Sequence, residues 1–487
     1  MKNNISVFAK KISSNLVILS ALWMIINLIY VYAILNGTKS YRIESASYIF
    51  ALILLLRLAS GSHQTTSDIN KEEPIKYRKL VWYFFPIIIW FLIYVPYINN
   101  PFLSDDYVFI ARYSSTPVAQ YEGAFFRPVF GLIFYIMLKI FGTSSFPFHL
   151  LNFILHISCS ILVLRISRYF LIGFKNTYIV YIVFLFNPIQ PETVVWISGL
   201  QELLWVFFFL SAFYLYIVEP VLDAKKCAFI VLFIALSLLS KETAIIFILV
   251  FFVSDLFFYK LKSERFPIKI HIINFFIAAT YIAIRTIIVG IPLDYFSSLN
   301  LFFIKSTISQ PFKIFLFPWN QSYIGEYVYI KLLISFFFIF IILIHFLKNN
   351  KEFTLFLCFS FILLYAGIIP LYKMFYVAPD LQGSRYLYFS AFGWGLLLSV
   401  LLIKIIKHKL LFHVICLVLI FALGYFMFRN LQPWRTAGEI IKSLPANIKQ
   451  EYAPDNYYGA YILRNGANEF VQLRKYGNTS GDIIDKK

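Results

Sequence analysis

Apolar runs of about 18 residues or more follow one another along almost the whole chain, and they constrain its fold more than any other feature. Each run is long enough for an α-helix to cross the hydrocarbon core of a bilayer. Hydrophobic residues make up 60% of the chain and charged residues only 14%, which is far from the balance of a soluble domain. The sequence therefore predicts an all-α polytopic membrane protein.

The basic residues predict how the helices cross the membrane. The chain carries a net charge of +19, and its lysines and arginines gather in short clusters between the apolar runs. This placement is typical of cytoplasmic loops and argues against a nucleic-acid-binding protein. It predicts about 13 transmembrane helices, with the N-terminus inside and the C-terminus outside.

Three parts are expected along the chain. Residues 1–79 form a transmembrane hairpin, with helices at about 14–36 and 46–61, and a cytoplasmic loop. Residues 80–428 form the membrane domain, and residues 429–487 form a small external tail. The helices expected in the membrane domain lie at about 80–98, 147–167, 177–190, 200–218, 227–239, 244–258, 270–290, 329–347, 353–371, 387–405 and 410–428.

The segment 128–142 is apolar but only about 15 residues long, and Lys139 interrupts it. This length suits an interfacial helix in the first large external loop better than a full span. If the segment did cross the bilayer, the basic cluster of Arg165, Arg168 and Lys175 would lie outside. The sequence therefore predicts that 128–142 stays at the outer interface.

Acidic residues are scarce, and two of them, Asp105 and Asp106, follow directly after the helix expected at 80–98. A membrane protein keeps carboxylates where water, a partner cation or chemistry supports them. The acidic pair therefore predicts a functional site, and the alternative is a solvated loop that happens to be acidic.

Other polar residues converge on the outer side when this topology is applied. His149, Asn152 and His156 follow the i, i+3, i+7 spacing of one helix face. The alternative for these three is a hydrogen bond between helices, and for Lys241 and Glu242 it is a cap on a tight hairpin. Taken together, the polar residues predict an active site at the outer membrane–water boundary. They are Asp105, Asp106, Arg127, His149, Asn152, His156, Glu192, Lys241, Glu242 and Arg385.

Five short strings, in order, resemble the GT-C class of membrane glycosyltransferases. The likeness is to the membrane part of the tetratricopeptide-linked O-mannosyltransferases, and the architecture also resembles the phage-type glucosyltransferases of O-antigen. Asn187, Gln190 and Leu200 depart from the pattern of the first family, and no tetratricopeptide repeats follow. The strings are FFRPVFGLIFYIMLKIFG (125–142), FHLLNFILH (148–156), FNPIQPETVVWISGLQELL (186–204), LLSKE (238–242) and SRYLYFSAFG (384–393).

The resemblance implies an inverting transfer of a hexose, glucose or mannose, from a polyprenyl-phosphate carrier to an acceptor outside the cytoplasm. The expected acceptor is a surface polysaccharide such as O-antigen, and the expected place is the outer face of a bacterial inner membrane. A carboxylate, Asp105 or Asp106, would serve as the general base. The donor phosphate would need cations. The resemblance implies Arg385, Arg127 and Lys241 for the phosphate, and His149, Asn152, His156, Glu192 and Glu242 for substrate contacts.

The partners are then a polyprenyl-phosphate sugar, a lipid-linked or surface glycan acceptor and membrane lipids. No cofactor is required, although a divalent metal beside the two acids is an alternative. The four cysteines lie in apolar runs without metal-ligand spacing, so neither a disulfide nor a zinc site is expected. The rival functions are a polysaccharide polymerase or ligase, a lipid-linked sugar transporter and a structural subunit. The tyrosine-rich tail is expected either to select the acceptor or to pack at the interface.

Overall fold

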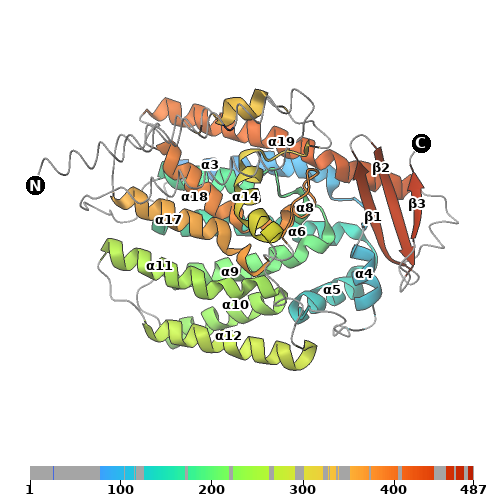
Figure 1. Cartoon of the computed structure of the whole chain (residues 1–487), viewed down its shortest axis with the longest axis horizontal. Coiled ribbons are helices and arrows are strands. Elements are labelled where there is room, and N and C mark those ends of the chain that lie inside the picture. The colour runs from blue at the N-terminus through green and yellow to red at the C-terminus, as the bar shows by residue number, and fades with distance from the viewer. Residues whose placement is uncertain are drawn as a thin grey trace, which may run out of the picture.

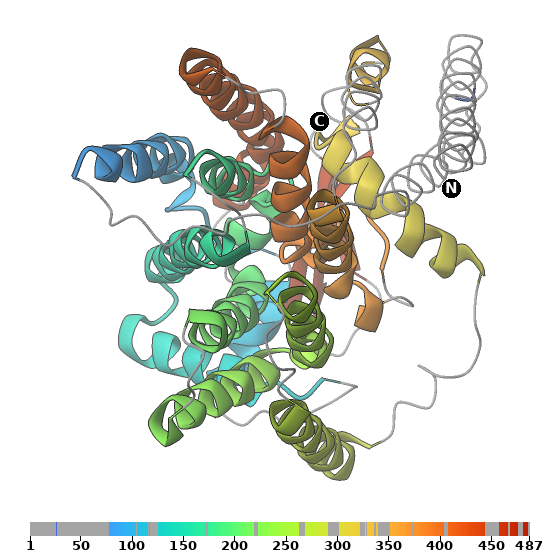
Figure 2. The same cartoon turned by 90° about the vertical axis from the view of Figure 1, so that its left-hand side faces the viewer.

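The computed structural model describes residue 26, the segment 77–443 with gaps, and three C-terminal strands. The gaps are residues 104, 115, 117–124, 171–173, 219–222, 263–267, 291–300, 322–326, 328, 336–337, 339–350, 372–374 and 404–407. The long helices lie side by side in one bundle along the longest axis (Figure 1), and Figure 2 views most of them close to end-on.

The first half of the bundle contains three of the five matching strings, and short helices lie between some of its long helices. The elements are α3 (Tyr77–Tyr94), η1 (Val95–Tyr97), α4 (Asp105–Tyr113), α5 (Pro128–Phe141), α6 (Ser145–Phe170), α7 (Phe174–Leu185), α8 (Pro191–Val194), η2 (Ile197–Gly199) and α9 (Leu200–Val218).

The second half contains the predicted break at 240–243, which lies between α10 and α11. The elements are α10 (Ala224–Ser240), η3 (Glu242–Ile246), α11 (Phe247–Lys262), α12 (Ile268–Val289), α14 (Leu301–Leu316), α17 (Lys351–Ala366), η4 (Ile369–Leu371), η5 (Ser384–Leu387), α18 (Ser390–Ile403) and α19 (Lys409–Ser443).

Local sequence signals explain several helix ends. The helix α10 begins after Asp223, whose carboxylate accepts a hydrogen bond of 2.7 Å from the backbone N–H of Lys226. The same helix ends where Lys241 adopts an extended conformation. The helix α5 begins with Pro128 in its first turn and ends at Gly142, whose φ is +59°. These signals position the loops that carry the polar residues.

Close packing at the centre of the bundle depends on small residues of α18. A Cβ added to Gly393 would lie 2.2 Å from the backbone nitrogen of Leu364 in α17. On the same helix, Gly395 faces Val180 of α7. Small residues let helix backbones approach each other in membrane bundles. The side chains of α7 from Tyr178 to Leu185 are all buried, so α7 is the apolar centre of the bundle.

The helix order separates the basic clusters from the other polar residues. The helices α9 and α10 follow each other closely in the chain and pack together. The hydroxyl of Ser237 donates a hydrogen bond of 2.7 Å to the backbone oxygen of Trp205. The basic pair at 225–226 therefore lies at one end of this hairpin and Lys241 at the other. The helix α6 likewise begins near His149 and ends near Arg168. The basic residues and the other polar residues of these helices therefore lie at opposite helix ends.

Four of the described helices are long and apolar enough to cross a membrane, judged by length and composition. The predicted total of about 13 spans is not confirmed, since the expected helices at 14–36 and 46–61 and most of 329–347 lie outside the described residues. The four helices are Ser145–Phe170, Ile197–Val218, Ile270–Val289 and Leu410–Glu439.

Three expectations about the fold are wrong. The segment expected to be a loop up to residue 329 contains the helix α14, and α19 continues 15 residues beyond its expected end at 428. The all-α expectation fails in the tail, where β1 (Tyr457–Asn465), β2 (Asn468–Lys475) and β3 (Gly481–Asp485) form an antiparallel sheet. The sequence contained a signal for it: only Gly466 and Ala467 separate the paired Asn465 and Asn468, and glycine is favoured as the first residue of a two-residue hairpin loop. The strand β1 lies next to α4 (Figure 1).

We expect α5 to remain on the side opposite the basic clusters, because its 14 residues span only about 21 Å. In a variant without native cysteines, Thr143→Cys should react with a membrane-impermeant maleimide applied from outside the cell. The matched variant Lys225→Cys should react only after permeabilisation. Reaction of both positions from the same side would contradict this topology.

Candidate active site

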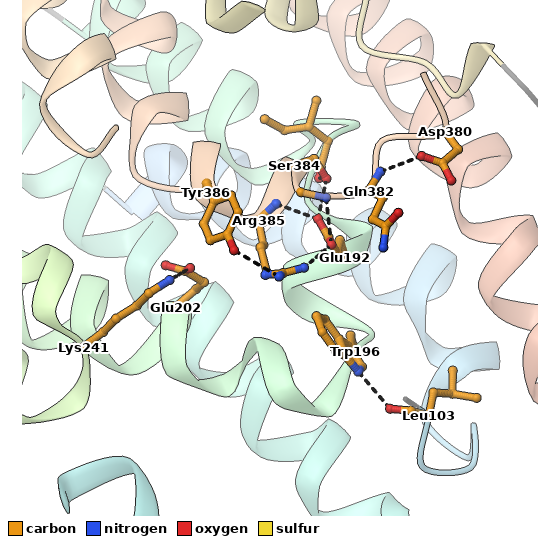
Figure 3. A network of polar contacts seen from close by, with 12 residues as sticks. Leu103, Glu192, Trp196, Glu202, Lys241, Asp380, Gln382, Ser384, Arg385 and Tyr386 are labelled. Carbon is orange, nitrogen blue, oxygen red and sulfur yellow. Dashed lines mark hydrogen bonds and ion pairs between the residues drawn. The ribbon is translucent and has the colours of Figure 1, made fainter. Parts of the chain in front are cut away.

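The centre of the polar network is Glu192, in the short helix α8, which is 5% exposed (Figure 3). Its carboxylate accepts hydrogen bonds from the backbone nitrogens of Gly383 (3.0 Å) and Arg385 (2.8 Å) and from the hydroxyl of Ser384 (3.1 Å). It also forms an ion pair of 2.5 Å with Nη1 of Arg385. Glu192 therefore fixes the position of the 383–385 turn rather than facing an open site.

Glycine is required in this turn. Gly383 has a φ of +88°, and a Cβ there would lie 2.2 Å from the backbone oxygen of Tyr376. The left-handed conformation is accessible to glycine at little cost. It aims the backbone N–H groups of residues 383 and 385 at the carboxylate of Glu192.

Arg385 has N–H donors beyond those that its ion pair with Glu192 uses. Its guanidinium carbon lies 4.8 Å from the ring centroids of both Trp196 and Tyr386. Its Nη2 also donates a hydrogen bond of 3.2 Å to the hydroxyl of Tyr386. The side chain of Arg385 is 24% exposed, whereas that of Glu192 is 6% exposed. A guanidinium has five N–H donors, so this arginine can hold Glu192 and still contact an anion.

The two acids at the start of α4 have different surroundings. Asp106 is buried, and its carboxylate accepts hydrogen bonds from the backbone nitrogens of Leu103 and Ser198, both at 2.8 Å, and from the Ser198 hydroxyl. Burial raises the pKa of Asp106 to about 7, although the hydrogen bonds from Ser198 and Leu103 act in the opposite direction. Asp106 thus links the start of α4 to the turn at 196–199.

Asp105 is half-buried, and none of the described residues donates a hydrogen bond to its carboxylate. Burial raises the pKa of Asp105, the nearby Arg385 and Arg112 lower it, and Glu192 raises it. The charge of Arg385 therefore acts on the carboxylate of Asp105. The adjacent pair predicted from sequence consists of one structural and one unengaged carboxylate.

The two other predicted phosphate ligands are both occupied by glutamates. Arg127 contacts Glu242 at 3.0 Å through Nε and at 2.9 Å through Nη2, and it also donates to Gln201. Lys241 is buried and pairs with Glu202 of α9, beside the ring of Tyr386 (Figure 3). The structure brings both cations to the end of the bundle that holds Arg385, but each has an internal partner.

Glu242 likewise has partners within the protein. Besides the ion pair with Arg127, its carboxylate accepts a hydrogen bond of 2.8 Å from the backbone nitrogen of Phe126. This contact holds the segment before α5 against the start of η3. These contacts join two distant parts of the chain, and they differ from the hairpin cap considered from sequence.

The polar face of α6 contacts neighbouring backbone. His149 lies 2.9 Å from the oxygen of Asn100, and Asn152 donates to the oxygens of Val194 and Trp196 at 3.3 and 3.1 Å. His156 contacts the hydroxyl of Tyr388 at 2.8 Å and a backbone oxygen of α7. All three side chains are buried. The three side chains share one face of α6, and their contacts in the structure are hydrogen bonds within the protein, as in the alternative considered from sequence.

Several residues of the network were missed from sequence. Trp196, Ser198 and Glu202 belong to a string quoted for the resemblance, but only their partners reveal their roles. Arg112 lies seven residues after Asp105 on α4 and therefore on the same helix face. The spacing of seven residues between the acidic Asp105 and the basic Arg112 was the sequence signal that could have identified Arg112.

No group of three or more His, Cys, Asp or Glu side chains that could hold a metal ion occurs in the described part of the chain. A metal beside the two acids was only an alternative, and Asp106 uses both carboxylate oxygens in hydrogen bonds within the protein. Asp105 is the member of the pair that retains acceptor capacity.

Comparison with known proteins gives two partial similarities, and no protein-family model matches the chain. A protein O-mannosyl-transferase of Caenorhabditis elegans is 30% identical over 124 residues, which are 24% of this chain and 17% of that protein. The match thus spans less than a fifth of the curated relative. The solved archaeal oligosaccharyltransferase AglB from Archaeoglobus fulgidus, in complex with an inhibitory peptide and a dolichol-phosphate, is 12% identical. It aligns with a TM-score of 0.40 over 78% of this chain and 60% of that one.

We expect Asp106→Asn to lower the free energy of unfolding by about 1–3 kcal/mol, because its amide NH₂ would face a backbone donor that the carboxylate now accepts. The measurement is thermal unfolding of the detergent-solubilised protein at about pH 8, above the pKa of Asp106. The matched variant Asp105→Asn should change stability by less than about 0.5 kcal/mol. Equal losses in both variants would contradict the division of roles between the two acids.

Proposed function

We propose that this chain is a membrane glycosyltransferase that moves a hexose from a polyprenyl phosphate to an acceptor hydroxyl outside the cytoplasm. One observation carries the proposal: the unengaged carboxylate of Asp105 lies near the partly exposed guanidinium of Arg385. A base for an attacking hydroxyl and a cation for a leaving phosphate are the two groups that such a transfer needs.

In the proposed reaction, the acceptor hydroxyl attacks the anomeric carbon of the sugar and gives its proton to Asp105. The bond between the anomeric carbon and the phosphate oxygen breaks, and the polyprenyl phosphate leaves with the electron pair. Attack opposite the leaving group inverts the anomeric centre. Arg385 stabilises the charge that develops on the phosphate, since its remaining N–H donors can form charge-assisted hydrogen bonds.

The structure leads us to revise the roles of the other cations. Arg127 and Lys241 each pair with a glutamate, so we assign them to holding the hairpin and α5 in place. Arg112 is a better second phosphate ligand, because it shares a helix face with Asp105 and no described residue accepts a hydrogen bond from it. We assign His149, Asn152, His156, Glu192 and Glu242 to supporting the site from behind.

Placement of the charged groups favours a transferase over the rival functions. A transporter would be expected to carry its polar site near the middle of the bilayer, whereas the network here lies at helix ends. The partial similarity to a protein O-mannosyl-transferase supports sugar transfer in general. We propose glucose or mannose as the sugar and a surface glycan such as O-antigen as the acceptor, with a polymerase or ligase as the second candidate.

Basic clusters at the opposite helix ends support an active site that faces away from the cytoplasm. We propose a bacterial inner membrane with the site on its outer side. The C-terminal sheet lies next to α4, so it is well placed to influence which acceptor reaches Asp105.

Asp105→Asn should lower transfer of labelled hexose from a polyprenyl phosphate about 10²- to 10⁴-fold, because an amide cannot take the proton of the acceptor. The assay uses purified protein in liposomes with polyprenyl-phosphate glucose or mannose and a crude surface glycan as acceptor. The control is Asp380→Asn, since Asp380 accepts a local hydrogen bond of 3.0 Å from the backbone nitrogen of Gln382 and no other from the residues that the structure describes. Wild-type rates in the Asp105 variant would contradict the proposed function.

Arg385→Lys should lower kcat about 10- to 100-fold, because a lysine keeps the charge but cannot contact Glu192 and a phosphate in one planar fork. Steady-state kinetics over a range of donor concentrations measure the effect. The control Arg435→Lys changes an exposed arginine that pairs with Glu439 on α19, and it should leave kcat unchanged. An unaltered kcat and KM in the Arg385 variant would remove this arginine from the site.

A further inference from the structure

We infer that Trp196 is a positioning residue that holds the acid-bearing start of α4 and Arg385 in one fixed arrangement. This inference rests on the proposed function. The indole contacts Arg385 and the backbone of the segment that leads into Asp105, although it need not touch the substrate.

The first contact is with the cation. The guanidinium carbon of Arg385 lies 4.8 Å from the centroid of the Trp196 ring, and Tyr386 lies at the same distance from that carbon (Figure 3). Cation–π contacts between arginine and tryptophan are favourable, more so where water is excluded. The two rings restrict the plane in which the guanidinium can present its remaining donors.

The second contact is with the segment that carries the acids. The ring N–H of Trp196 donates a hydrogen bond of 3.0 Å to the backbone oxygen of Leu103, two residues before Asp105. The backbone nitrogen of Leu103 in turn donates to Asp106 at 2.8 Å. Moving the indole would therefore move both the start of α4 and the stacking surface of Arg385.

Trp196 itself is held firmly in place. Its backbone oxygen accepts hydrogen bonds from Asn152 at 3.1 Å and from the backbone nitrogen of Gly199 at 2.9 Å. A Cβ on Gly199 would lie 2.1 Å from the backbone oxygen of Thr193, so the turn is as tight as glycine allows. The tryptophan is 7% exposed. It is thus a rigid link between α6, the start of α4 and the 383–385 turn.

The link matters for chemistry because the attacking hydroxyl and the leaving phosphate must lie on opposite sides of the anomeric carbon. Small displacements of reacting groups reduce rates strongly, by as much as about 10²-fold for 1 Å. The charged or titratable groups that face Asp105 are Arg385 and Arg112, which favour its ionised form, and Glu192 and Asp106, which oppose it. If Arg385 is held less firmly, it stabilises the ionised form of Asp105 less.

The test is Trp196→Phe, which keeps an aromatic ring beside Arg385 but removes the N–H that binds Leu103. We expect kcat to fall about 10- to 100-fold with the KM for a polyprenyl-phosphate sugar changed less than about threefold. We also expect the acidic limb of the kcat/KM profile to move to higher pH, because Asp105 loses part of the stabilisation from Arg385. A merely structural residue would lower the amount of active protein without moving this limb.

The matched control is Trp394→Phe, in which the same change is made in α18. The ring of Trp394 packs against Phe312 and Phe315, and within the described segments its N–H has no acceptor. If Trp196→Phe does not fold, incorporation of 3-benzothienylalanine at position 196 keeps the shape of the indole and replaces only the N–H with sulfur.

A wild-type kcat and pH profile in the Trp196 variants, together with an inactive Asp105→Asn, would overturn this inference and leave the proposed function intact. An active Asp105→Asn would overturn the proposed function itself. A fall in kcat with a shifted acidic limb in the Trp196 variant, and neither change in Trp394→Phe, would support the positioning role.

Discussion

Burial of the Glu192 carboxylate against Arg385 is the interaction on which the rest of the site depends. A charge removed from water is costly unless it is paired and hydrogen-bonded. Glu192 meets this condition through the guanidinium, two backbone N–H groups and a hydroxyl. Satisfying the charge fixes the 383–385 turn against α8, and the turn then presents Arg385 at the site.

Two further ion pairs extend the same principle across the end of the bundle. Arg127 and Glu242 join the segment before α5 to the start of η3, and Lys241 and Glu202 join the end of α10 to α9. Each cation pairs with a glutamate from another part of the chain. The positive charges of Arg127 and Lys241, which the sequence suggested for phosphate binding, are therefore largely neutralised within the protein. What distinguishes Asp105 is that it lies beside this array without a hydrogen-bond donor from the described residues.

The structure gathers the site residues predicted from sequence at one end of the bundle, and their roles remain a prediction. The acidic pair, the arginine of SRYLYFSAFG and the polar face of α6 do gather at one end of the bundle. The sequence could not predict which of these residues are proposed to take part in the reaction and which support the site. Asp106 is buried and accepts hydrogen bonds from three donors, whereas Asp105 is half-buried and accepts none from the described residues. Two adjacent aspartates look the same in sequence. Trp196 illustrates the point, since its link between Leu103 and Arg385 joins segments that no local pattern connects.

The sequence by itself determined most of the long helices that the structure describes, the break at 240–243 and the separation of basic loops from the other polar residues. These features follow from local properties: apolar length, helix-ending residues and the placement of lysine and arginine. The tertiary structure alone decided which charges are paired, because the partners are far apart in the chain. Arg385 and Glu192 are 193 residues apart, and the pairing of groups at such separations depends on how whole helices pack rather than on any neighbouring residue.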